Sequence, residues 1–162
     1  MASHDVVELI LEDHRTMEDL LRRMRSIEAD RAKALREFSR LLIAHGEAEE
    51  SEVYPALRRY RKIDNDEVDH GEEEHAEGNE ALLALLEADG AGDDEWDERL
   101  ENLVRAVGHH LDEEERTLLN EARRHVPEER RAELGEAFRR ERDGLLASDC
   151  GSVENVRRLV KG

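Results

Sequence analysis

Apolar residues recur along most of the chain at alternating steps of three and four, which is the spacing of the buried face of a helix. The first run, for example, contains Val7, Ile10, Met17, Leu21 and Met24. Three further long stretches have the same pattern. Steps of three and four are typical of helices that pack nearly parallel to one another. The sequence therefore predicts an all-α fold.

Capping residues, proline and glycine divide this pattern into separate helices. Ser3 or Asp5 can cap the first helix, Asp93 or Asp94 can cap the fourth, and the Asp-Gly-Ala-Gly sequence at 89–92 ends the third. The missing N–H of Pro55 predicts a kink or break in the second helix. The expected helices cover residues 5–26, 30–60, 64–88, 93–124 and 127–144, and a short helix capped by Ser152 follows in the tail.

Short connections make successive helices antiparallel, so the first four helices predict an up-down-up-down four-helix bundle. Residues 1–125 form this bundle in the prediction. Residues 126–162 add a C-terminal fifth helix and a tail that pack on the bundle or on a partner. The apolar side of the fifth helix includes Leu134, Phe138 and Leu145.

Each of the four expected buried faces contains one histidine where an apolar residue is usual. In the second and fourth helices a glutamate follows the histidine one turn later. The expected inward residues of these two helices are Phe38, Leu42, His45, Glu49, Glu52 and Ala56, and Trp96, Leu100, Leu103, Val107, His110, Glu114, Thr117 and Glu121. The corresponding histidines of the first and third helices are His14 and His75.

Carboxylates do not belong in a bundle core unless something compensates their charge. An unpaired buried carboxylate costs several kcal/mol or takes up a proton. Histidine and glutamate at positions i and i+4 lie on one face of a helix, so both can reach one metal ion. With alternating helix directions the four histidines lie at a similar height. Four imidazoles and two carboxylates are the ligands that two metal ions need, with each glutamate able to bridge.

An internal repeat supports a symmetric site. Residues 45–54 parallel residues 110–119, and the acidic-histidine sequence at 12–14 parallels that at 73–75. The chain thus reads as two helical hairpins, each with one histidine followed by one histidine–glutamate pair. A site with two-fold pseudosymmetry between the hairpins follows.

The same residues resemble a known family. The motifs Asp13-His14, His45-x3-Glu49-Glu50-x2-Val-Tyr-Pro55, Glu74-His75 and His110-x3-Glu114-Glu115 are similar to those of the hemerythrin-like HHE cation-binding domains. The resemblance covers residues 1 to about 125. It implies a non-haem centre of two iron ions, bridged by carboxylates within a four-helix bundle. The ligands that it implies are His14, His45, Glu49, His75, His110 and Glu114.

The third helix departs from the pattern of the oxygen-carrying hemerythrins, which place two histidines four residues apart there. Four residues before His75 stands Gly71. The nearest substitute is His70, which points about 140° away on an ideal helix and could ligate only through a local distortion. If His70 does not bind, one metal keeps an extra open position, which favours reactivity over reversible carriage. His109 has the same difficulty beside His110 and is interpreted as a flanking residue.

Other residues near the motifs have simpler interpretations. In the oxygen carriers the carboxylate ligand of the fourth helix follows its histidine by five residues, so Glu115, five residues after His110, is an alternative to Glu114. Glu50 and Glu115 are also close enough to accept hydrogen bonds from ligand histidines. Gly78, like Gly71, either leaves space for a ligand or allows helices to cross closely. Tyr54 is interpreted as a packing residue, and Cys150 receives no function.

Composition excludes several classes of function. The chain has 162 residues, with 25 Lys and Arg against 43 Asp and Glu, so the formal net charge is −18. This balance disfavours binding to nucleic acid and to anionic membranes. The chain lacks an apolar run long enough to span a bilayer and the features of a signal peptide. A single cysteine excludes an internal disulfide framework, and we expect a cytoplasmic protein, either a monomer or a homodimer.

Imidazole and carboxylate ligands with open positions suit iron or manganese and also accept zinc. The first hypothesis is a di-iron protein that binds, senses or breaks down a small oxidant: dioxygen, hydrogen peroxide or nitric oxide. Peroxidase-like or catalase-like turnover is its enzymatic form. The alternatives are an iron-responsive binding module, in which the fifth helix or tail reports metal occupancy, and a metal-free helical interaction protein.

Overall fold

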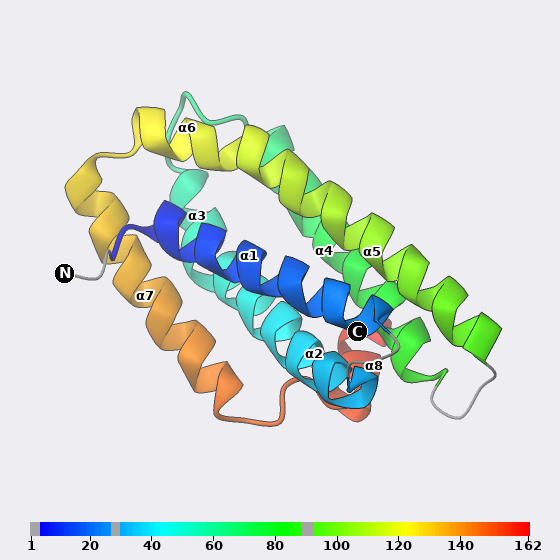
Figure 1. Cartoon of the computed structure of the whole chain (residues 1–162). Coiled ribbons are helices and arrows are strands. Elements are labelled where there is room, and N and C mark those ends of the chain that lie inside the picture. Colours follow the sequence, from blue (N-terminus) through cyan, green and yellow to red (C-terminus); the bar gives the residue numbers. More distant parts are fainter. Residues whose placement is uncertain (1–3, 27–29, 89–92) are drawn as a thin grey trace.

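The computed structural model describes residues 4–26, 30–88 and 93–162. All of the regular secondary structure in these ranges is helical, which confirms the predicted all-α class (Figure 1). The elements are α1 (Val6–Arg25), α2 (Arg31–Ala48), the π-helix η1 (Glu49–Val53), α3 (Tyr54–Leu57), α4 (Asn65–Leu86), α5 (Asp93–Arg116), α6 (Leu118–His125), α7 (Glu128–Leu146) and α8 (Val153–Lys161).

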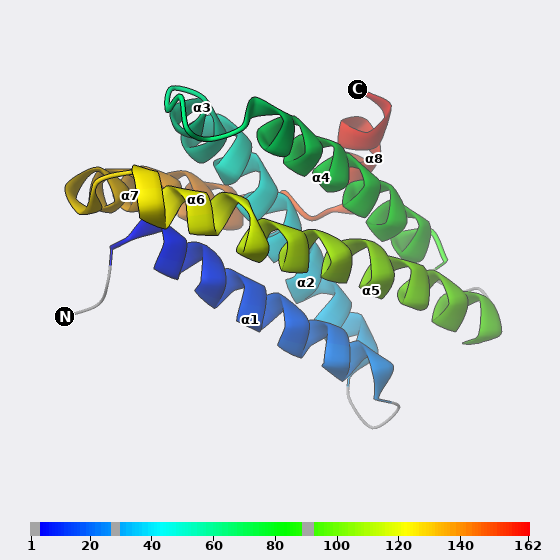
Figure 2. The ribbon, with the colours of Figure 1, turned by 90° about the horizontal axis from the view of Figure 1, so that it is seen from above.

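Four long helices lie side by side and hold the centre of the molecule. Helix α1 packs against α2 and α5, and α4 packs against α5 and α2. In Figure 2 the chain runs from left to right along α1 and α4, and in the opposite direction along α2 and α5. Helices α1 and α2 therefore form one helical hairpin, and α4 and α5 form another. No helix among the described ranges is both long and apolar enough to cross a membrane.

Side chains cap the helices at several of the predicted positions. The Asp5 carboxylate accepts a hydrogen bond from the backbone N–H of Val7 at 2.9 Å, which caps α1. The Ser152 hydroxyl oxygen accepts from the backbone N–H of Asn155 at 3.2 Å and caps the short C-terminal helix. These bonds satisfy backbone donors that have no partner within the helix. Ser3 and the predicted stop at 89–92 lie outside the described residues.

The second helix is not continuous to residue 60. It changes to the π-helix η1 at Glu49, the second residue of the His45–Glu49 pair, and α3 follows. A π turn contains one extra residue, so the buried face moves from the predicted Glu52 to Val53 and Tyr54. Pro55 lies in the first turn of α3, where its missing N–H costs little. The change of helix type thus begins before Pro55, and the chain remains helical through the position where a kink or break was predicted.

The fourth helix is also interrupted, which corrects the prediction of one helix to residue 124. Helix α5 ends at Arg116 and α6 begins at Leu118, with Thr117 between them at φ −109° and ψ −86°. The buried face consequently moves from Thr117 and Glu121 to Leu118, Leu119 and Ala122. In the internal repeat Thr117 corresponds to Glu52, so both hairpins change register at the same point after their histidine–glutamate pair.

The last two helices pack on different parts of the bundle. Helix α7 contacts α1, α2 and η1, and buries Leu134 and Phe138. A Cβ at Gly135 would lie 1.5 Å from the backbone oxygen of His4, so this close approach requires glycine. Helix α8 contacts α4 and buries Val156.

The apolar core has two parts, with polar residues between them. Along α1 one part includes Val6 to Ile10, and the other begins at Met17. Asp13 and His14 lie between the two parts and are themselves buried. The packing therefore places a layer of polar side chains at the middle of the bundle and excludes water from both sides of it.

Candidate metal centre

The four histidines predicted on the buried faces meet in this polar layer. They come from α1, α2, α4 and α5, and none is more than 9 % exposed. Glu49 is 0 % exposed and Glu114 is 2 % exposed. The structure thus brings together all six residues of the predicted ligand set: His14, His45, Glu49, His75, His110 and Glu114.

These six residues form two adjacent groups that share Glu114. His14, His45 and Glu114 form one group, and Glu49, His75, His110 and Glu114 form the other. Within each group, one nitrogen or oxygen of every residue lies within 4.8 Å of those of the others. We call these residues together the buried group.

Each glutamate lies between histidines of the two groups. Oε1 of Glu49 is 3.1 Å from Nε2 of His45 and 3.1 Å from Nε2 of His75. The two oxygens of Glu114 lie 3.1 Å from Nε2 of His14 and 3.7 Å from Nε2 of His110. Each carboxylate therefore contacts histidines from two different helices.

A second carboxylate orients each histidine. In every case Nδ1 faces this carboxylate and Nε2 faces the centre of the buried group. The pairs are His14 with Glu115 at 2.9 Å, His45 with Asp13 at 2.8 Å, His75 with Glu50 at 2.6 Å and His110 with Glu74 at 3.0 Å. Such partners fix the ring orientation and the proton position of metal-binding histidines.

Two of these four orienting residues were predicted, namely Glu50 and Glu115. Asp13 and Glu74 were missed as partners, although each directly precedes a motif histidine. Each serves the histidine of the following helix in its own hairpin, which a pattern within one helix does not reveal. Glu50 and Glu115 instead reach across to the other hairpin, so the four contacts follow the two-fold repeat.

Several atoms at the centre make no hydrogen bond to any residue within the described ranges. They are Nε2 of His14, His45 and His110, one oxygen of Glu49 and one oxygen of Glu114, all fully buried. Buried polar atoms are nearly always paired. Here imidazole nitrogens and carboxylate oxygens converge on common points, as ligands do around a cation. The donor set therefore fits a metal ion.

The electrostatics of the buried group also favour positive charge. Burial lowers the pKa of His45, but the carboxylates of Glu49 and Asp13 outweigh it and raise this pKa to about 10. Burial likewise lowers the pKa of His75, and Glu49 and Glu50 raise it to about 10. Burial raises the pKa of Glu49, yet the two histidines hold it well below its usual value. A cation would enter a region whose carboxylates already stabilise positive charge.

Tyr54 packs in the core, as its interpretation as a packing residue predicts, and it also lies against the buried group, which the sequence did not predict. Its hydroxyl donates a hydrogen bond to Glu114, and its ring stacks on His75 with centroids 5.5 Å apart. A Cβ at Gly71 would lie 2.8 Å from the tyrosine oxygen. Glycine at the position of the missing histidine therefore makes room for Tyr54. The internal repeat did not indicate this contact of Tyr54, because the equivalent position in the other hairpin is Leu119.

His70 is not part of the buried group. Its side chain is 49 % exposed, and α4 is regular around it, so the five-residue spacing from His75 turns it away. It lies instead beside Glu74, Glu113 and His109. His109, which was predicted to lie beside the site without binding metal, has a side chain that is 61 % exposed.

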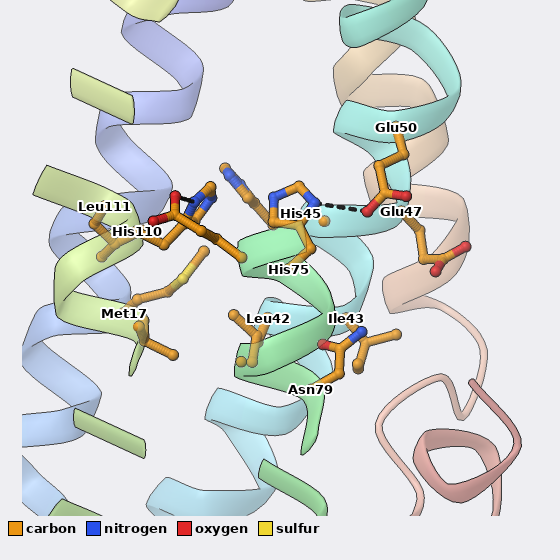
Figure 3. A pocket seen from close by; sticks show the side chains of 14 residues that line it. Met17, Leu42, Ile43, His45, Glu47, Glu50, His75, Asn79, His110 and Leu111 are labelled. Carbon is orange, nitrogen blue, oxygen red and sulfur yellow. Dashed lines mark hydrogen bonds and ion pairs between the residues drawn. The ribbon is translucent and has the colours of Figure 1, made fainter. Parts of the chain in front are cut away.

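A pocket borders the buried group on its apolar side (Figure 3). Its wall includes His45, His75 and His110 together with Met17 and Leu111. Figure 3 shows the three histidines at one level, with apolar side chains on the side toward Leu42.

Gly78 also lines this pocket. A Cβ there would meet only Val107, at 3.8 Å, so Gly78 leaves open space rather than a close helix crossing. The two glycines around His75 therefore have different roles.

Helix α7 reaches the buried group through two contacts. The Arg142 guanidinium donates a hydrogen bond to Oδ1 of Asp13 at 2.8 Å, while Oδ2 of Asp13 accepts from His45. The ring of Phe138 meets His45 edge-on, with centroids 5.3 Å apart. The C-terminal helix outside the repeat is thus connected to the orientation of one central histidine.

Comparison with known proteins gives one match. The family model described as the hemerythrin HHE cation binding domain matches residues 5–122. Searches of the curated proteins and of the solved structures found no match. The matched range includes every residue of the buried group and all four of the carboxylates that orient its histidines.

Proposed function

Because the chain belongs to the hemerythrin HHE cation-binding family, we propose that it is a non-haem di-iron protein that acts on a small oxidant. The observation that carries this proposal is the convergence of four Nε2 atoms and two glutamates in two groups that share Glu114. In the proposal, the four long helices form an up-down-up-down bundle around these ions.

The proposed ligands of one iron are His14 and His45, and those of the other are His75 and His110. Glu49 and Glu114 would contribute ligand oxygens to both ions, which is supported by their position between histidines of both groups. Imidazole and carboxylate ligation suits ferrous iron, with manganese or zinc as substitutes.

When bound, the iron ions supply electrons and a Lewis acid for reaction with dioxygen, hydrogen peroxide or nitric oxide. The residues of the chain have three roles around them. The orienting carboxylates hold each Nε2 toward the centre. Tyr54 donates a hydrogen bond to Glu114 and restrains that carboxylate. The two parts of the apolar core cover the site at both ends along the bundle.

The pocket supports a small reactant. Its wall combines the apolar side chains of Met17, Leu42, Val107 and Leu111 with three of the proposed ligand histidines, so a small molecule there would lie next to the proposed metal site. Dioxygen, peroxide and nitric oxide all fit this description. The single cysteine agrees with a reducing compartment, and the proposal places the protein in the cytoplasm.

A second candidate function is an iron-responsive binding module, which the contacts of α7 favour. Metal binding at His45 would act on Asp13 and so on Arg142. In this version the chain does not turn over an oxidant, and the C-terminal region reports occupancy to a partner.

Rapid mixing of the iron-loaded, reduced protein with each oxidant separates the candidates. We expect at least one oxidant to change the near-ultraviolet absorption of iron within seconds. Gly78→Val should slow this change at unaltered iron content, because it fills the pocket. Gly108→Val is the matched control, since a Cβ at Gly108 meets no atom within 4 Å.

A protein that holds two irons but reacts with none of the three oxidants would contradict the reactive centre and favour the binding module. A protein that binds no metal would contradict both.

A further inference from the structure

A second cluster of possible ligands lies outside the buried group, between α4 and α5. It consists of His70 and Glu74 on α4 and of His109 and Glu113 on α5. Both pairs have the i, i+4 spacing that places two side chains on one face of a helix. The two helices pack against each other, so the four side chains meet.

The distances within this cluster match those around a small divalent cation. Nε2 of His70 is 3.4 Å from Glu74 and 3.2 Å from Glu113. Nε2 of His109 is 3.0 Å from Glu74 and 2.9 Å from Glu113. Ligands about 2.1 Å from a tetrahedral ion lie roughly 3.4 Å from one another. Only modest adjustment is therefore needed to place an ion among the four atoms.

Glu74 has a buried oxygen that faces the two histidines of the cluster without forming a hydrogen bond to a described residue. Its side chain is 5 % exposed, and Oε1 accepts a hydrogen bond from Nδ1 of His110. The other oxygen, Oε2, is buried and makes no hydrogen bond to any residue that the structure describes. This oxygen points at the two exposed histidines of the cluster. A buried carboxylate oxygen in this state is a ready ligand.

The cluster also borders a surface hollow that reaches the buried group. His70, Glu74 and Glu113 line the hollow, and so do His110 and Glu114. His70 therefore lines the same space as His110 and Glu114, two of the predicted ligands of the central metals.

We propose that His70, Glu74, His109 and Glu113 form a third, solvent-accessible site for a divalent transition-metal cation. Two imidazoles and two carboxylates suit Zn²⁺, Mn²⁺, Fe²⁺ or Co²⁺. Glu74 is shared, with one oxygen on this cation and the other on His110. The outer cation therefore lies one carboxylate away from the buried group.

Equilibrium dialysis of the metal-stripped full chain against Co²⁺, followed by elemental analysis, tests this site. The test variant is His70→Ala with His109→Ala, which leaves Glu74 in place to hold His110. The matched control is His4→Ala with His125→Ala. It likewise removes two histidines, but each of these contacts a single glutamate and lies outside the cluster. Because the replaced side chains of the test variant are largely exposed, we expect both proteins to fold, as circular dichroism can verify.

The wild-type chain and the control should each bind one Co²⁺ more than the test variant. Equal Co²⁺ content in the test variant and the wild type would overturn the third site and would show the cluster to be a set of ion pairs. The test depends only on a difference of one bound ion between the test variant and the other two proteins, whatever the occupancy of the buried group. Failure of the di-iron proposal therefore remains distinguishable from failure of the outer site.

Discussion

The hydroxyl of Tyr54 occupies the space next to Gly71 that a longer side chain would need, with 2.8 Å between its oxygen and a Cβ built on the glycine. In the oxygen-carrying hemerythrins that the sequence resembles, a histidine is expected at this position of the third helix. Here a tyrosine from the end of the second helix approaches instead and donates a hydrogen bond to Glu114. The departure in the motif is thus matched by a residue from a neighbouring element.

Replacement of Gly71 by alanine should destabilise the metal-free protein. Overpacking against the Tyr54 ring and hydroxyl costs about 1–3 kcal/mol, and the better helix propensity of alanine offsets about 1 kcal/mol. We expect a net loss of about 1 kcal/mol in urea unfolding. Gly78→Ala, the control in the same helix, should instead gain about 1 kcal/mol, because its Cβ meets Val107 at an ordinary 3.8 Å. Equal effects at both glycines would contradict this role of Tyr54.

Asp13→Asn should weaken metal binding without removing a ligand. Asp13 accepts from Nδ1 of His45 at 2.8 Å, and its charge makes Nε2 a better donor to a cation. Loss of such a partner typically lowers metal affinity by about 10–100-fold. Competition with a chromogenic chelator measures the change. Asp19→Asn, an exposed residue of the same helix, should have no effect, and a wild-type affinity in Asp13→Asn would rule out the orienting role.

Replacement of either bridging glutamate should change the number of bound metals. Glu49→Ala and Glu114→Ala should each reduce two bound ions toward one or none, because each carboxylate lies between histidines of both groups. Elemental analysis after removal of loosely bound metal gives the stoichiometry. Glu52→Ala, in the same π-helix as Glu49, is the control and should retain both ions. Unchanged stoichiometry in both test variants would exclude bridging.

The Cys150 thiol should react slowly in the folded protein. Burial raises its pKa, and the residue is only 5 % exposed, so little reactive thiolate is present near neutral pH. We expect labelling by a thiol reagent at pH 8 to be clearly slower than in urea, because burial both limits access to the sulfur and raises the pKa of the thiol. The native rate should rise as pH increases toward the raised pKa. Equal rates in the native and unfolded chain would contradict the buried position.

Periodicity and the internal repeat predict the central features of this protein. The histidine in each of the four long helices and the i+4 glutamates pointed to one buried site, and the structure brings them together. The helical class and the capping by Asp5 and Ser152 also followed from local sequence. These features depend on spacing within one helix, which the sequence states directly.

Contacts between helices were harder to predict. The π-helix that begins at Glu49 and the interruption at Thr117 shift the buried face by about one residue, and an ideal helical period does not include such a shift. For the same reason the contact of Tyr54 with Glu114 was not predicted. The contact of Arg142 with Asp13 joins residues 129 positions apart, and nothing in either local sequence indicates it.

The metal content of the purified chain tests the central claim most directly. We would express the protein without added metal, remove loosely bound ions with a weak chelator, and measure iron per chain together with the ultraviolet-visible spectrum. Two irons per chain with near-ultraviolet absorption of ferric iron are expected. Two zinc ions would support the ligand set and contradict iron as the resident metal. A folded chain that holds no metal and takes up none on reconstitution with ferrous iron would contradict the di-iron account.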